Sequence, residues 1–312
     1  MAEASAHKLS YIEEVTRGTT PATPLFTYLP DTRTTLALTK DNLETSRLTG
    51  DRFPAEPRTG ANGVSGDIPA DLSYGAYDPF IESALQGTFV ENTPGDDTAL
   101  AGDTRKSFSI LREFSDFAGG AKPFLLYSGC EVATWSLEAA ANGLATSTFT
   151  FFGQDMSGPD AAPPASTSYL PATTTDPFDS FSGSMEIDDV AQCIVTDYSV
   201  TINNGHAPKY TVGCQGTGDP SVTQSIIEGS ITVYFEDEVL YQKFIDETSM
   251  SLKLTLVDPA GNSLIVYMPN LKIGSGTQPD VSEDGAITMP INFTAHKDDT
   301  LTSHISVQRI EA

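Results

Sequence analysis

The side chains that most often do chemistry are few in this sequence, and they form no catalytic or metal-binding spacing. The four histidines are His7, His206, His296 and His304. The three cysteines are Cys130, Cys193 and Cys214. Zinc sites and Cys–His nucleophile sites need short, motif-defined spacings, and these residues have none. An odd cysteine count also argues against a disulfide framework. We therefore expect no catalytic set, no metal and no cofactor.

A pair of carboxylates offers one enzymatic alternative. Asp67 and Asp71 lie on the same face of one predicted strand, because every second residue of a strand points the same way. Two carboxylates flanking a glycosidic bond can hydrolyse a polysaccharide. Carbohydrate sites usually also have aromatic platforms, whereas Trp135 is the only tryptophan of the chain. A hydrolase is therefore the less favoured interpretation.

The charge balance argues against a surface that grips nucleic acid. The 312 residues include 42 acids but only 17 Lys and Arg, so the formal net charge is -25. Charged residues make up 19% of the chain, below the roughly 25% of ordinary domains, so the acidity comes from missing bases. Residues 1–160 and 161–312 carry net charges of -11 and -14 (22 acids against 11 bases, and 20 against 6). Phosphate binding needs clustered cations, which neither half supplies.

The beginning of the sequence has no recognisable targeting signal. Residues 1–15, MAEASAHKLSYIEEV, contain no apolar run of signal-peptide length. A run of about 18 apolar residues, which a membrane helix needs, occurs nowhere in the sequence. We expect a soluble protein that is synthesised in the cytoplasm.

Apolar and polar residues alternate over most of the chain, which predicts half-buried β-strands and a mainly β fold. Residues 197–203 (DYSVTIN) and 251–258 (SLKLTLVD) are examples. Only residues 75–86 and 237–247 have helical character. The second of these opens with three consecutive acids, 236–238, which suit the positive end of a helix dipole.

One succession of elements occurs twice along the sequence. Residues 66–72 and 229–235 both begin with Gly-x-Ile and lead to a helix with a Phe-Ile pair, at 80–81 and 244–245. Three predicted strands follow each helix: 107–114, 123–129 and 144–155 in the first copy, and 251–258, 263–269 and 286–298 in the second. Ordered repetition of this kind predicts a duplicated domain.

The repetition sets the expected domain boundaries. We expect a first domain over 1–155 and a second over 185–312, each mainly β with one helix. The segment between them, 156–184, is rich in Pro, Ser, Thr and Ala. That composition predicts a semi-extended linker outside the core.

The alternating strands have a second face that is acidic or neutral. This face includes Asp67, Asp71, Asp197 and Glu228, each beside apolar residues that point the other way. Such a face is either an ordinary solvated sheet surface or the wall of a channel through which a polyanion passes without binding. These four residues are the candidates for lining such a channel.

Several segments, taken in order, resemble a known family. They are 11–48, 51–85, 229–244, 267–271 (YMPNL) and 305–310 (ISVQRI). The chain is similar over these segments to tail tube, or major tail, proteins of bacteriophages with long non-contractile tails. The resemblance covers nearly the whole chain outside 88–105 and 156–184, and the family has no catalytic residues to carry over.

The resemblance implies a structural protein of the virion tail, in which each of the two tandem domains is a β-sandwich or half-barrel with one flanking helix. Family members form rings in which the inner sheets close into one continuous β-barrel, and the rings stack into a tube through which the genome passes at ejection. It implies partners as well: further copies of the chain, the tape measure protein in the lumen, and the tail terminator and baseplate or tail-tip proteins at the ends. Double-stranded DNA would pass without specific binding.

The duplication and the resemblance together predict a stoichiometry. A ring commonly contains six units and this chain supplies two, so we expect a trimer that forms a pseudo-hexameric ring. The alternative is a hexamer in which one half of each chain decorates the outside.

Long polar loops are the expected contacts between rings. We expect these contacts from 88–105, 130–142 and 274–284. Their candidate residues are Glu91, Asp96, Asp97, Asp103, Asp280 and Glu283. The alternative function is another virion structural role, or a capsid-decoration or adhesin-like binding protein.

Overall fold

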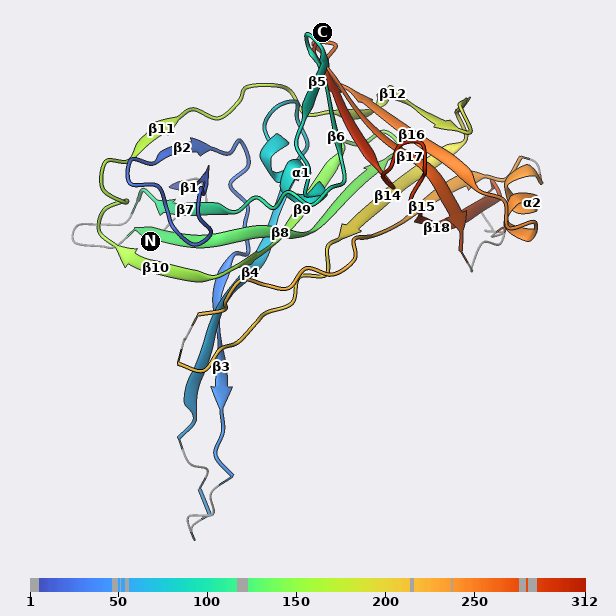
Figure 1. Cartoon of the computed structure of the whole chain (residues 1–312). Helices are drawn as coiled ribbons and strands as arrows, with labels where there is room; N and C mark the ends of the chain where they lie inside the picture. The colour runs from blue at the N-terminus through green and yellow to red at the C-terminus, as the bar shows by residue number, and fades with distance from the viewer. Residues whose placement is uncertain are drawn as a thin grey trace.

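The computed structural model describes residues 6–46, 50, 52–53, 56–116, 123–213, 216–236, 238–274, 279 and 285–312. This part of the chain is mainly β, as expected, with nineteen strands and two short helices (Figure 1). The strands are β1 (His7–Glu13), β2 (Leu25–Tyr28), β3 (Ala37–Leu43), β4 (Arg58–Asp71), β5 (Val90–Thr93), β6 (Asp96–Leu100), β7 (Phe108–Phe114), β8 (Phe124–Ala140), β9 (Thr146–Gly153), β10 (Asp155–Asp160), β11 (Ser168–Leu170), β12 (Asp179–Ile187), β13 (Val190–Gln192), β14 (Val195–Asn203), β15 (Ile226–Tyr234), β16 (Met250–Val257), β17 (Ser263–Ile273), β18 (Thr288–Ala295) and β19 (Ser306–Ile310). The helices are α1 (Asp78–Leu85) and α2 (Val239–Ile245).

Two sets of six strands share one pairing order. The N-terminal strand set runs β1-β7-β8-β9-β4-β3, and every pair in it is antiparallel. The C-terminal strand set runs β12-β16-β17-β18-β15-β14, again antiparallel throughout. In each set one helix follows β4 or β15 in the sequence and precedes the next strand of the set, β7 or β16. The predicted helices 75–86 and 237–247 are both present, with shorter bounds.

The two strand sets are joined edge to edge within the chain. β14 pairs with the second half of β8, from Asp197 opposite Ala140 to Asn203 opposite Thr134. A second connection runs through β6, which pairs with β19, and β19 pairs in turn with β17. β4, β9, β8, β14, β15 and β18 therefore form one continuous sheet across both sets.

The glycine of the repeated Gly-x-Ile motif, within β4 and within β15, is explained by close backbone contact. A Cβ atom on Gly66, whose φ is +151°, would come within 2.5 Å of the Cα atom of Leu36, the residue just before β3. A Cβ atom on Gly229 would come within 2.5 Å of the Ser199 carbonyl oxygen on the preceding strand, β14. Both positions exclude a side chain for the same reason, although they lie in different strand sets.

Apolar side chains on one face of the continuous sheet form the core. Ile68, Phe149, Trp135, Ile202 and Ile227 lie next to one another across successive strands, and each is at most 1% exposed. The Trp135 indole N–H donates to Ser147 Oγ at 2.6 Å, so the one tryptophan is a satisfied core residue.

The two helices differ in burial. α1 buries Phe80, Ile81, Ser83, Ala84 and Leu85, and none of the seven residues of α2 is buried. Of the acids expected at the start of α2, Glu236 and Glu238 precede the helix and Asp237 lies outside the described residues. Neither α1 nor α2, the helices of the described chain, is long and apolar enough to span a membrane.

Three expectations about loops and the linker differ from the structure. Residues 88–105 contain the β5–β6 hairpin, which is anchored on β19, so they are not a free loop. Residues 130–142 are not a polar excursion either, because β8 continues through them to Ala140. The segment 156–184 carries β11 and most of β10, and it buries Phe178 completely, so it does not stay outside the core.

A buried charge cluster fastens several connections to the N-terminal strand set. Glu131 on β8 accepts hydrogen bonds at 2.8 and 2.9 Å from the Arg105 guanidinium, and it lies 2.6 Å from Arg17. His206 Nε2 lies 3.3 Å from the same carboxylate, and Arg105 also pairs with Asp219. The cluster thus ties the N-terminal segment and the β14–β15 connection to β8.

The Glu131 carboxylate stays charged inside the protein. Burial alone would raise its pKa, but the hydrogen bond from His206 and the charges of Arg105 and Arg17 lower that pKa below the ordinary value of 4.5. A lowered pKa in the folded state means that the charged form stabilises the fold. This contribution is fully present above about pH 4.5 and is lost as the pH falls through the lowered pKa.

We expect Glu131→Gln to lower the unfolding free energy at about pH 7 by about 3–5 kcal/mol, because Arg17 and Arg105 keep their charges without the balancing carboxylate. Urea unfolding, followed by circular dichroism, measures this difference. The difference should shrink on acidification below about pH 4.5, as the wild-type carboxylate becomes protonated. Equal stabilities at neutral pH would contradict the role given to Glu131.

We expect Phe80→Ala to lower the unfolding free energy by about 3–5 kcal/mol, the usual cost of removing a fully buried aromatic ring. The Phe80 ring contacts the rings of Tyr11, Phe108 and Phe151 at centroid distances of 4.8–5.1 Å. Phe244→Ala is the matched control, because Phe244, the counterpart of Phe80 on α2, is only half-buried. In the isolated chain it should cost much less, and equal losses in urea unfolding would contradict this difference.

Candidate functional site

The face of the continuous sheet opposite the core is polar from one strand set to the other. One row of paired residues across it is Pro69, Thr148, Ser136, Thr201, Glu228, Thr294 and Lys272. The next row is Asp71, Thr146, Glu138, Ser199, Ser230 and Asn292. We call this surface the polar sheet face. Its position follows from the strand alternation, which sends every second side chain to the core.

All four residues proposed to line a channel lie on the polar sheet face. Asp67 and Asp71 lie on β4, Asp197 on β14 and Glu228 on β15, and none of them points to the core. The pairings connect the strands that carry them into one surface. The structure therefore brings the four carboxylates onto one face, although they lie up to 161 positions apart in the sequence.

A fifth carboxylate, Glu138, shares this face and was missed in the sequence. It lies on β8 between Thr146 of β9 and Ser199 of β14. The sequence does contain the alternation that predicts a strand here, because Trp135, Leu137 and Ala139 alternate with the polar residues Ser136 and Glu138. The error was to treat 130–142 as an excursion rather than as part of a strand.

Two of the carboxylates have partners close by. The Thr150 hydroxyl donates to Asp67 Oδ1 at 2.7 Å, and Arg33 Nη2 lies 3.3 Å from Asp71 Oδ1. Arg33 also binds Asp31, so one cation is shared between two acids. Lys272, at the β17 end of the face, donates to the Glu247 carbonyl oxygen. The charge of the face is thus mainly negative. Arg33 is paired with Asp31 and Asp71, and Lys272 is hydrogen-bonded to Glu247.

The residues proposed for contacts between rings are placed differently. Asp96 accepts a hydrogen bond from Gln308 at 2.7 Å, and Asp97 pairs with Arg309 at 2.7 Å. Both therefore fasten the β5–β6 hairpin to β19 within the chain. Glu91 and Asp103 are exposed. Asp280 and Glu283 lie outside the described residues.

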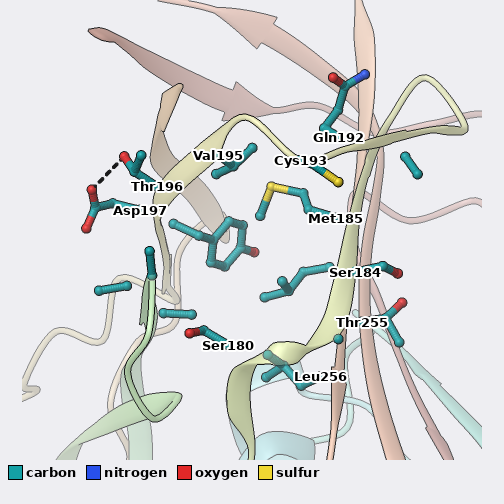
Figure 2. A pocket seen from close by; sticks show the side chains of 17 residues that line it. Ser180, Ser184, Met185, Gln192, Cys193, Val195, Thr196, Asp197, Thr255 and Leu256 are labelled. Carbon is teal, nitrogen blue, oxygen red and sulfur yellow. Dashed lines mark hydrogen bonds between the residues drawn. The ribbon is translucent and has the colours of Figure 1, made fainter. Parts of the chain in front are cut away.

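The C-terminal strand set contains a cavity of about 240 Å³ beside the junction of the two sets (Figure 2). It lies between the start of β14 and the strands β12 and β16, and Met185, Cys193 and Leu256 are among its lining residues. Of the lining residues, only Cys193, Asp197 and Tyr198 have ionisable side chains. The lining offers mainly an apolar surface.

The cysteines differ in their exposure to solvent. Cys130 is buried, but Cys193 is exposed, and Cys214 lies outside the described residues.

Burial suppresses the acid–base chemistry of the cavity's tyrosine. Burial raises the pKa of the Tyr198 hydroxyl far above its ordinary value of 10, so the hydroxyl stays neutral. Asp197 is exposed and accepts a hydrogen bond from the Thr196 hydroxyl at 2.9 Å. In the residues that the structure describes, no group of three or more His, Cys, Asp and Glu could hold a metal ion.

A mainly β chain with one continuous polar sheet face and a buried apolar face is an architecture suited to a structural assembly. A family model described as phage tail tube protein matches residues 4–295. Because the match spans almost the whole chain, the protein belongs to the phage tail tube family, and it is a structural protein of the virion tail. A comparison with curated proteins finds no match.

Proposed function

We propose that copies of this chain assemble into stacked rings, with the polar sheet face of each copy lining a shared channel for the genome. The observation that carries this proposal is the continuity of that face across β8 and β14, which join the two strand sets into one wall. Closing such sheets into a barrel also removes the exposed edges that an isolated sheet leaves.

The charge of the polar sheet face suits a conduit for DNA. Phosphate binding by clustered cations strengthens with every contact, so a basic wall repeated along a tube would hold the passing DNA. A wall with Asp67, Asp71, Glu138, Asp197 and Glu228 repels phosphate instead. The shortage of Lys and Arg in the whole chain supports the same interpretation.

The chain supplies two units of the ring, and three chains complete a pseudo-hexameric ring. The matching order of the two strand sets supports a division into tandem domains over 1–155 and 185–312. The 156–184 segment runs between them and packs on β2 and β8. A six-chain ring is the alternative stoichiometry.

The β3–β4 hairpin is the better candidate for contact between stacked rings. It extends well beyond the body of the molecule (Figure 1). Glu91 and Asp103 stay candidates for the same contact because they are exposed. Asp96 and Asp97 are engaged within the chain, so they serve the fold first.

The other properties proposed for this chain are those of a tail tube protein. The chain acts as a structural protein and not as an enzyme, and Asp67 and Asp71 serve as wall residues rather than as a hydrolytic pair. It is synthesised in the host cytoplasm. Its partners are the tape measure protein in the lumen and the terminator and tail-tip proteins at the ends, and it needs no cofactor.

We expect the purified, concentrated protein to form rings or tubes with a central channel in electron micrographs. Light scattering on the same sample should give a ring mass of three times the 33.2 kDa of the chain. A six-chain mass would keep the tube function and exclude the pseudo-hexamer. A protein that stays monomeric at every concentration would contradict the proposed self-assembly.

We expect Lys substitutions on the polar sheet face to slow DNA passage without preventing tube assembly. Ser136→Lys with Ser199→Lys adds two cations on the adjacent strands β8 and β14, and every ring would repeat them. The rate of DNA ejection from virions that carry the variant, measured with a DNA-binding dye, should fall, and the effect should weaken at high salt. Thr93→Lys, on the exposed strand β5, is the control. An unchanged ejection rate would show that this face does not line the channel.

A further inference from the structure

The two helices are covered to different extents, and this difference points to a surface for a second copy of the chain. α1 contacts β8, β14 and β6. For α2, the main contact with a strand of the described chain is with β17, and Lys243 also pairs with Asp188. β8 and β17 occupy the same place in the two strand sets. At the junction, α1 contacts both β8 and β14. Within the described chain, α2 therefore has the counterpart of β8 beside it, but it lacks the counterpart of β14.

The junction between the two strand sets shows how α1 is covered. The chain leaves β14 at Asn204, whose backbone N–H donates to the Ala133 carbonyl of β8 at 3.0 Å. The Asn204 side chain donates to the Ala84 carbonyl of α1 at 2.7 Å. One residue at the end of an added strand therefore binds both the neighbouring strand and the neighbouring helix.

The corresponding surface of α2 is apolar and exposed. Ile245 is 55% exposed, whereas its counterpart in the repeated Phe-Ile pair, Ile81, is 1% exposed. Phe244, Ile245 and Glu247 line an open groove with Lys272 and Ile273 at the end of β17. We call these five residues the α2 groove.

β3 is the strand that corresponds to β14. Each is the outer strand of a hairpin, β3 with β4 and β14 with β15. The two hairpins can be aligned by superposing Ile231 of β15 on Ile68 of β4. Each of these residues is paired with an apolar residue of the next strand in its set, Ile291 of β18 or Phe149 of β9. In this alignment Lys40 of β3 takes the position of Asn204.

The free edge of β3 has the amides that an added strand needs. The Thr35 N–H donates to the Asp67 carbonyl at 2.9 Å, so the odd-numbered residues that follow exchange hydrogen bonds with β4. The N–H groups of Leu38 and Lys40 then point away from β4. Among the described strands, β4 is the only one that pairs with β3, whereas β14 pairs on both sides.

We infer that β3 of one copy docks at the α2 groove of a second copy, so that the junction between chains repeats the junction within the chain. Lys40 then faces Asp246 and Glu247, the two acids that follow α2. Lys243, the basic residue in the last turn of α2, is already paired with Asp188. The inference rests on the proposed self-assembly and names the surfaces that carry it.

Such a contact joins two different surfaces, so it is heterologous and each copy both gives and receives a strand. This property allows a test with two blocked variants. Lys40→Pro removes the outward N–H and the charge of the donating edge. Ile245→Glu places a carboxylate in the receiving groove beside Asp246 and Glu247. Thermal melts followed by circular dichroism establish that both variants are folded.

Each variant alone should stay monomeric in light scattering, because every junction in a pure sample contains the blocked surface. An equimolar mixture should form a dimer of twice 33.2 kDa and nothing larger, because only one junction is intact in the pair. The expected mass change on mixing is therefore twofold. A purely structural defect in either variant would not be repaired by adding the other.

Two matched controls accompany the test. Val190→Glu introduces the same charge on β13 at a residue that is 59% exposed, and it should assemble as wild type does. Lys40→Ala keeps the outward N–H and should assemble, but at a higher protein concentration than wild type.

The outcomes separate this inference from the proposed function. If wild type forms rings and either blocked variant also forms them, or if the mixture stays monomeric, the docking of β3 at the α2 groove is wrong and the tube function stands. If wild type forms no rings or tubes, the proposed self-assembly itself fails.

Discussion

The register of antiparallel pairing across β4, β9, β8, β14, β15 and β18 is the constraint on which the rest of the structure depends. A shift of one residue in any pair would exchange the two faces of that strand. Ile68, Phe149 and Trp135 would then meet water, and the neighbouring Asp and Thr side chains would enter the core. Burying even one unpaired carboxylate is costly, so the core fixes the register and the register fixes the polar sheet face.

Charged groups help to fasten the long connections, in addition to strand pairing and apolar packing. The Glu131 cluster fastens the N-terminal segment and the β14–β15 connection to β8, and Arg309 fastens the β5–β6 hairpin to β19. The Glu131 cluster and the Arg309 ion pair each join segments that are far apart in the sequence, so they also hold the two strand sets together. An acidic chain with few bases thus uses Arg17, Arg105 and Arg309 at internal junctions, which leaves the polar sheet face with few cations.

The same edge-to-edge pairing serves inside the chain and, in our proposal, between chains. Strand edges are a liability in an isolated sheet because they invite uncontrolled pairing. In a ring that closes, every edge finds one partner, so the liability becomes the means of assembly. The exposed apolar residues of α2 fit this view, because α2 lies at the end of the molecule far from the N-terminal strand set (Figure 1).

The sequence by itself determined the mainly β fold, both helices, the ordered repetition and the faces of Asp67, Asp71, Asp197 and Glu228, because alternation and Gly-x-Ile spacing are local signals. Only the tertiary structure decided that β8 runs on to Ala140 and pairs with β14, that Asp96 and Asp97 bind β19, and that Phe178 is buried. These features depend on contacts between distant segments, which no local pattern encodes. The different burial of the two Phe-Ile pairs has the same origin: identical residues become core or surface according to what packs against them.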